Sequence, residues 1–110
     1  MGFFSDTRVA LDLINTADAI NACLRATEPY LGKYDFGEPF RGSDCSYIRA
    51  CVDFIEPKAQ YMQQRLHDLP ASKWMTTMVP TVDGRRTAAP GFIMGMQHMC
   101  YELREQLKLR

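Results

Sequence analysis

The chain has no excess of charge and no long hydrophobic run. Its 13 basic and 13 acidic residues cancel to a formal net charge of +0, which removes overall charge as an argument for binding nucleic acid or a membrane surface. No stretch approaches the eighteen or so apolar residues of a transmembrane helix, and no basic segment followed by an apolar run marks a secretory signal. The sequence therefore predicts a soluble, intracellular protein without a membrane span.

The sequence also lacks the spacings that carry common chemistries. It contains no Gly-rich phosphate loop, no Gly-x-Ser-x-Gly and no His-Glu-x-x-His. Its four cysteines and two histidines do not fall at the intervals of zinc or redox sites. We therefore expect no catalytic site, no metal site and no cofactor, and we expect reduced cysteines that behave as small hydrophobic residues. The enzymatic alternative is an activated thiol, such as Cys100 paired with His67, because such partners meet in space rather than in sequence.

What the chain does contain is apolar residues at helical spacing. Between residues 48 and 69 they recur at intervals of three and four, which places them on one face of an α-helix. Similar stripes run over residues 9–24 and 92–107. The pattern predicts an all-α fold, with a single helical domain over residues 1–110 and a small bundle of three main helices. These helices are expected at about 6–27, 44–68 and 91–108.

Two prolines bear on the limits of these helices. Glu28-Pro29 is expected to end the first helix, since the residue before a proline is steered away from the helical region. Pro57 lies inside the second stripe without resetting its phase, which favours one kinked helix. The alternative is two in-line helices with Pro57 at the first position of the second one.

Residues 70–90 are less regular. Ser72 is a helix-capping residue, and it predicts a short helix near 72–78. Asp83-Gly84 is a turn signal that favours an alternative α+β fold, with a small hairpin near 81–88.

The connector between the first two helices is rich in aromatic residues. It holds four rings in eleven residues, more apolar surface than an exposed loop normally carries. The rings either fold back over the bundle as a lid or dock a partner, since aromatic residues are enriched at interface hot spots. On the last helix, Met94 lies off the main stripe and widens its apolar face. The predicted partner-binding residues are Tyr30, Tyr34, Phe36, Phe40 and Met94.

A second candidate surface is a small basic patch. Lys73, Arg85 and Arg86 lie in the irregular segment with only Asp83 opposing them. Such a patch could contact a phosphate or an acidic partner, although a solvated loop would have the same composition. No predicted helix is basic enough to act as the recognition helix of a helix–turn–helix protein.

Together these features favour a non-enzymatic interaction or assembly subunit. In this hypothesis the protein binds a protein partner or self-associates as a homo-oligomer within a larger complex. The uneven charge supports it, because residues 1–56 carry a formal charge of −4 and residues 57–110 carry +4. The alternative is a small regulatory or ligand-binding module that contacts phosphate or nucleic acid through the basic 73–86 segment.

Overall fold

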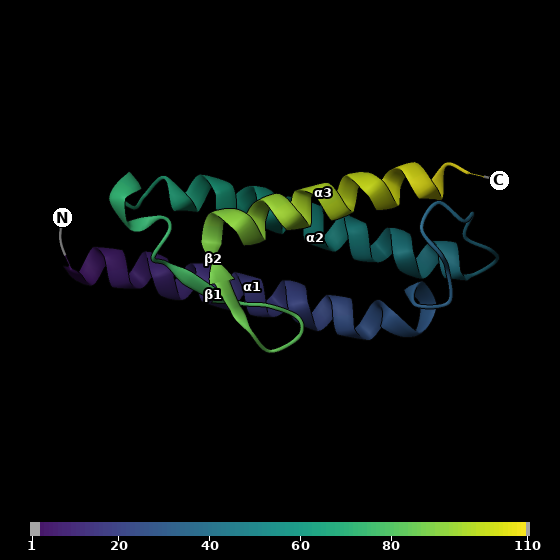
Figure 1. The fold of residues 1–110 in the computed structure, drawn as a ribbon, viewed down its shortest axis with the longest axis horizontal. Coiled ribbons are helices and arrows are strands. Elements are labelled where there is room, and N and C mark those ends of the chain that lie inside the picture. The colour runs from purple at the N-terminus through teal and green to yellow at the C-terminus, as the bar shows by residue number, and fades with distance from the viewer. Residues whose placement is uncertain (1–2, 110) are drawn as a thin grey trace.

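Three long helices and one short hairpin make up the fold (Figure 1). The computed structural model describes residues 3–109. Helix α1 covers Phe3–Leu31, α2 covers Asp44–Leu66 and α3 covers Ala89–Leu107. Between α2 and α3 lie a 3-10 turn, η1 (Ala71–Lys73), and two antiparallel strands, β1 (Met78–Pro80) and β2 (Arg86–Ala88). The expected helical bundle is confirmed, and the small hairpin of the alternative is present within it.

Helix α2 is the central element of the bundle. It packs against α1 on one side and against α3 on the other, as its apolar stripe predicts. Its buried side chains include Ile48, Ile55 and Met62, which are completely inaccessible to solvent. One hydrophobic cluster joins buried residues of the three helices with Phe40, Leu69 and Val79. The molecule is long and narrow, with extents of 51 × 22 × 18 Å.

Both prolines, Pro29 and Pro57, lie inside helices. This agrees with the prediction for Pro57 but not with the prediction for Pro29. Pro29 does not end α1, which continues to Leu31 and closes with a hydrogen bond from Gly32 N to Glu28 O of 2.8 Å. A proline in the last turn removes only one backbone donor, and Pro29 lies on the exposed side, where water can take that donor's place. Pro57 is likewise exposed, and α2 is a single helix through it.

Between α2 and α3, the helical turn is shorter and the hairpin turn is longer than the sequence suggests. The predicted helix near 72–78 is reduced to η1, and Met78 already belongs to β1. In the hairpin Met78 pairs with Ala88 and Pro80 with Arg86, so that its turn is longer than Asp83-Gly84 alone suggests.

So short a hairpin is stable only when it packs on other elements. Val79 is completely buried, and the hairpin is bonded to α1 at two points. The side chain of Asn21 donates to the carbonyl of Pro80 at 2.9 Å, and that of Arg25 donates to the carbonyl of Val82 at 3.1 Å. The hairpin therefore bridges α1 and α3 on the side of the bundle that faces the viewer in Figure 1.

Candidate functional site

The aromatic connector, residues 32–43, does not present its rings as one surface. Phe40 is buried in the core, and Tyr34 packs edge-on against it with ring centroids 4.9 Å apart. Phe36 is 85% exposed. Tyr30 belongs to the end of α1, where it stacks on Tyr47 of α2 at 4.1 Å. The connector thus covers the bundle with Phe40 and Tyr34 and leaves Phe36 in solvent.

The connector is tied to the start of α2 through Asp44. The hydroxyl of Tyr34 donates to the Asp44 carboxylate at 2.5 Å, and Lys33 forms an ion pair with it at 2.9 Å. These two donors hold the pKa of Asp44 below its ordinary value, because both favour the charged carboxylate.

In the middle of the connector, a buried side chain that the sequence analysis missed holds the backbone. Gln106 of α3 donates from Nε2 to the carbonyls of Asp35 and Glu38, at 3.1 and 2.6 Å. Gln106 is buried on the inward face of α3, a face on which amphipathic helices normally carry apolar residues.

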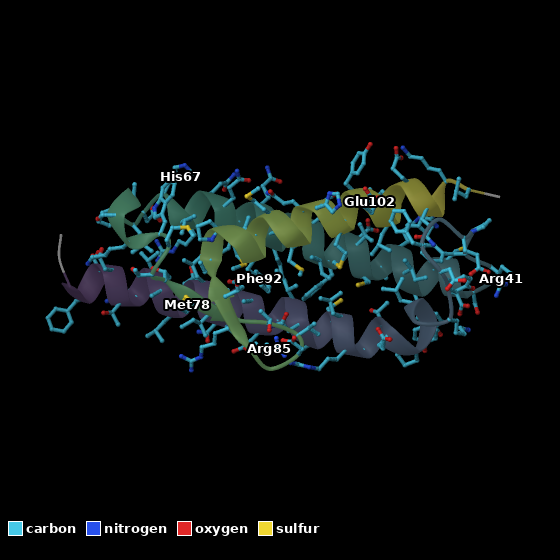
Figure 2. The ribbon with its side chains drawn as sticks, in the orientation of Figure 1. Arg41, His67, Met78, Arg85, Phe92 and Glu102 are labelled. Atoms are coloured by element: carbon cyan, nitrogen blue, oxygen red, sulfur yellow. The ribbon has the colours of Figure 1, made fainter. Side chains whose placement is uncertain are left out.

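The predicted basic residues lie on different elements. Lys73 is in η1, where its ammonium forms an ion pair of 2.5 Å with Asp6 of α1. Arg85 is at the tip of the hairpin (Figure 2), and its guanidinium lies 3.8 Å from Asp83. Arg86 is exposed in β2, and within residues 3–109 it has no carboxylate partner. Two of the three charges are therefore already countered within the chain.

Met94 lies on the exposed rim of a small hollow at the end of the bundle where α3 begins. The hollow has a volume of about 180 Å³, and Trp74 and Ile93 also line it. Met94 is 69% exposed, as its position off the main stripe suggests. Trp74 is fixed there by a hydrogen bond from Nε1 to the carbonyl of Leu69 and by contact with the ring of His67.

A groove lies between α1 and α2, and the sequence analysis did not identify it. Its volume is about 590 Å³. We call it the aromatic groove. It is lined by Asp12, Thr16, Asp53, Phe54, Pro57, Lys58 and Tyr61.

A row of partly exposed aromatic rings follows this groove along α2. Tyr47, Phe54 and Tyr61 are 50%, 41% and 44% exposed. They are seven residues apart, or two turns of helix, so they lie one above another on the same side of α2. The sequence contains this seven-residue spacing, but the apolar stripe beginning at Ile48 is the stronger periodic pattern on the same helix.

Contacts within the chain hold each of these rings in place. Tyr47 stacks on Tyr30. The ammonium of Lys58 lies 4.6 Å from the centre of the Phe54 ring, in cation–π geometry. The hydroxyl of Tyr61 donates to the carboxylate of Asp12, and this bond raises the pKa of Tyr61 because it favours the protonated phenol.

The charged groups of the groove are also satisfied within the chain. Arg65 donates from Nε to Asp12 at 2.9 Å. Arg104 donates to Asp53 at the same distance. The groove therefore offers fixed aromatic surface with few unmet charges, which suits contact with another apolar surface.

Three of the cysteines lie close together between the helices, and two of them, Cys51 and Cys100, are buried. Cys51 of α2 lies near Thr27 and Cys23 of α1, and Cys100 of α3 lies near Cys23. Burial raises the pKa of Cys51 and of Cys100 to about 11 each. Cys100 faces Glu56 and Arg104, whereas His67 bonds to the carbonyl of Gln63 at the end of α2. Within residues 3–109, no three His, Cys, Asp or Glu side chains are placed to share a metal ion.

These pKa values predict slow alkylation of the buried thiols. At pH 7.5 a thiol of pKa about 11 is about 0.03% ionised, against about 10% for an ordinary cysteine. We expect iodoacetamide to label Cys51 and Cys100 of the folded protein at least about 100-fold more slowly than in urea, as read by peptide mass spectrometry. Rapid labelling of Cys100 in the folded protein would instead support the thiol-enzyme alternative.

Comparison with known proteins identifies no relative: no family model, no curated sequence and no solved structure matches the chain. Over residues 3–109, every helix is too short or too polar to span a lipid bilayer.

Proposed function

We propose that this protein is a non-enzymatic interaction subunit that binds another protein chain through the aromatic groove. The observation that carries the proposal is the row formed by Tyr47, Phe54 and Tyr61, which leaves nearly half of each ring in solvent. Isolated exposed apolar residues are normal on a protein surface, but three aromatic residues in line beside a groove are typical of a binding surface. Tyrosine and other aromatic residues are also the side chains that most often dominate interface energetics.

The rigidity of the row supports the same function. Because Tyr30, Lys58 and Asp12 already fix the three rings, little side-chain entropy remains to be lost on binding. Ordering a flexible side chain at an interface costs about 0.5–1.5 kcal/mol. Because these rings are already held in place, binding through them should incur little of this cost.

The proposal also places the protein inside the cell, because its four cysteines carry free thiols.

The proposal predicts that a charge placed in the middle of the row abolishes association. We expect Phe54→Arg to remove any self-association or co-purifying partner of the wild-type chain in native mass spectrometry, with helicity unchanged in circular dichroism. The reason is that an unpaired guanidinium would have to be desolvated in an apolar contact. Tyr101→Arg is the matched control, since Tyr101 is a 61% exposed aromatic residue on α3, away from the groove.

Two results would contradict the proposal. One is association that Phe54→Arg leaves intact. The other is a wild-type chain that stays a bare monomer both in extracts and when purified. Salt-sensitive binding of an oligonucleotide that is lost in Arg85→Ser/Arg86→Ser would favour the phosphate or nucleic-acid alternative.

A further inference from the structure

We propose that the aromatic groove is occupied by a second copy of this chain, packed so that the two α2 helices run antiparallel across a two-fold axis beside Phe54. The inference rests on the proposed function and names its partner. It is drawn from the order of residues along the row, the position of the hollow, the area of exposed surface and the charges around it.

The row on α2 reads nearly the same in both directions. Phe54 stands at its centre, with Tyr47 seven residues before it and Tyr61 seven residues after it. Between the rings, on the same exposed side, lie the short apolar residues Ala50 and Pro57. A two-fold contact requires that residue i meets residue j and that j meets i. Rotation about Phe54 satisfies this condition, because it sets Tyr47 against the partner's Tyr61 and Phe54 against its own copy.

The position of the hollow fits the same arrangement. The groove lies along the second half of the row, where Phe54, Pro57 and Tyr61 line it. The two-fold rotation brings the first half of the partner's row, with the partner's Tyr47, over this half. Each copy therefore offers a ring where the other offers space, since about 590 Å³ is ample for one aromatic side chain.

The exposed area is sufficient for the centre of a dimer interface. An aromatic side chain carries about 150–250 Å², so the exposed fractions of Tyr47, Phe54 and Tyr61 provide about 270 Å². One side of a standard homodimer interface contains about 500 Å² of apolar surface. The three rings supply about half of it, and the remainder falls to Ala50, Pro57 and the stem of Lys58 beside them.

The charges around the row favour an uncharged partner surface over a strongly charged one. Asp12 is bonded to Arg65 and Tyr61, Asp53 is bonded to Arg104, and Lys58 lies over the Phe54 ring. A charged partner would have to displace these contacts, whereas the same apolar row on a second copy leaves them in place.

Cysteine cross-linking tests the geometry. A disulfide requires two Cα atoms within about 7 Å of each other, which only a residue beside the two-fold axis can achieve with its own copy. We expect Phe54→Cys to form a covalent dimer on mild copper–phenanthroline oxidation. Tyr47→Cys alone should not do so, because positions 47 and 47 of the two copies would lie about 21 Å apart along the helices. The double variant Ala50→Cys/Lys58→Cys keeps all three rings and places its cysteines four residues either side of Phe54, so it should cross-link as well, and its failure to do so would overturn the arrangement.

The wild-type chain and Tyr101→Cys are oxidised in parallel, to measure cross-links from the native thiols and from an exposed cysteine outside the row. A covalent dimer of Tyr47→Cys alone would mean that the helices run parallel, and it would overturn the antiparallel arrangement. Equal cross-linking of Tyr101→Cys and Phe54→Cys would overturn it as well.

Sedimentation equilibrium of the unmodified chain tests the occupant itself. We expect a species of twice 12.6 kDa, with a dissociation constant that Phe54→Arg raises at least about 30-fold, as for loss of a hot-spot residue, and that Tyr101→Arg leaves unchanged. A monomer up to millimolar concentration would refute the self-association. If that monomer still binds a co-purified protein that Phe54→Arg releases, the proposed function stands and only the second copy is excluded.

Discussion

Replacing Ile55 with alanine is expected to lower the free energy of unfolding by about 3 kcal/mol. Ile55 is completely buried at the middle of α2, the helix that packs on both others. Truncating a buried isoleucine to alanine costs about 2–5 kcal/mol, because transfer free energy is lost and a cavity remains. In a domain whose total stability is about 5–15 kcal/mol, this is a large fraction, and it lowers the melting temperature by more than about 10 °C.

The matched comparison is the neighbouring residue, Phe54→Ala. Its ring is 41% exposed, so at low protein concentration we expect a loss below about 1 kcal/mol. Urea unfolding of the two variants, with equal m-values, gives both numbers. Equal losses would show that both sides of α2 are equally buried, and they would contradict the division of this helix into a core side and a binding side.

This division shows what the sequence could predict and what it could not. The stripe over residues 48–69 identified the core side of α2, because burial of apolar surface dominates the folding energy and leaves a periodic trace. The same helix carries a second apolar row at Tyr47, Phe54 and Tyr61. Sequence spacing alone does not distinguish a row that meets α1 and α3 from one that meets solvent. That distinction depends on how many neighbouring helices the fold supplies, which is a tertiary property.

The connector shows the same limit at the level of single residues. The sequence analysis singled out Tyr30, Tyr34, Phe36 and Phe40, at the end of α1 and in the connector, but the choice between a lid and a docking surface was open for all of them. The structure divides them, since Phe40 is in the core and Phe36 is in solvent. One of the contacts that fix the connector comes from Gln106, about seventy residues further along the chain. In the sequence, a polar residue on the inward face of a helix only interrupts the apolar stripe. Its burial is explained by the distant backbone carbonyls to which it bonds.

Gln106→Glu is expected to destabilise the protein in a pH-dependent way. The wild-type amide donates to the carbonyls of Asp35 and Glu38, and an ionised carboxyl at position 106 would face both carbonyl oxygens with no proton to give. Loss of these bonds and desolvation of the charge should cost about 2–3 kcal/mol at pH 7. Only the protonated acid can donate to a carbonyl, so the pKa of the new carboxyl in the folded variant must lie above its ordinary value of about 4.3.

The direction of the pH effect follows from that raised pKa. Between the unfolded and the folded pKa, the folded variant binds more protons than the unfolded chain, so its stability relative to wild type falls as pH rises. Below about pH 4 the acid is protonated in both states and the deficit should be smallest. Urea unfolding of variant and wild type at pH 4 and pH 7 measures the difference, and the contribution of shared groups such as Asp44 cancels.

Gln97→Glu separates this effect from a general response to added negative charge on α3. Gln97 bonds to the side chain of Gln63 at the surface, where water can replace that partner, so we expect a change below about 0.5 kcal/mol at either pH. Hydrogen exchange should show faster exchange of residues 35–40 in Gln106→Glu and no change there in Gln97→Glu. If Gln106→Glu is as stable as wild type at pH 7, the connector is held by Phe40 and Tyr34 alone. The two bonds from Gln106 would then contribute nothing to keeping Phe36 where the structure places it.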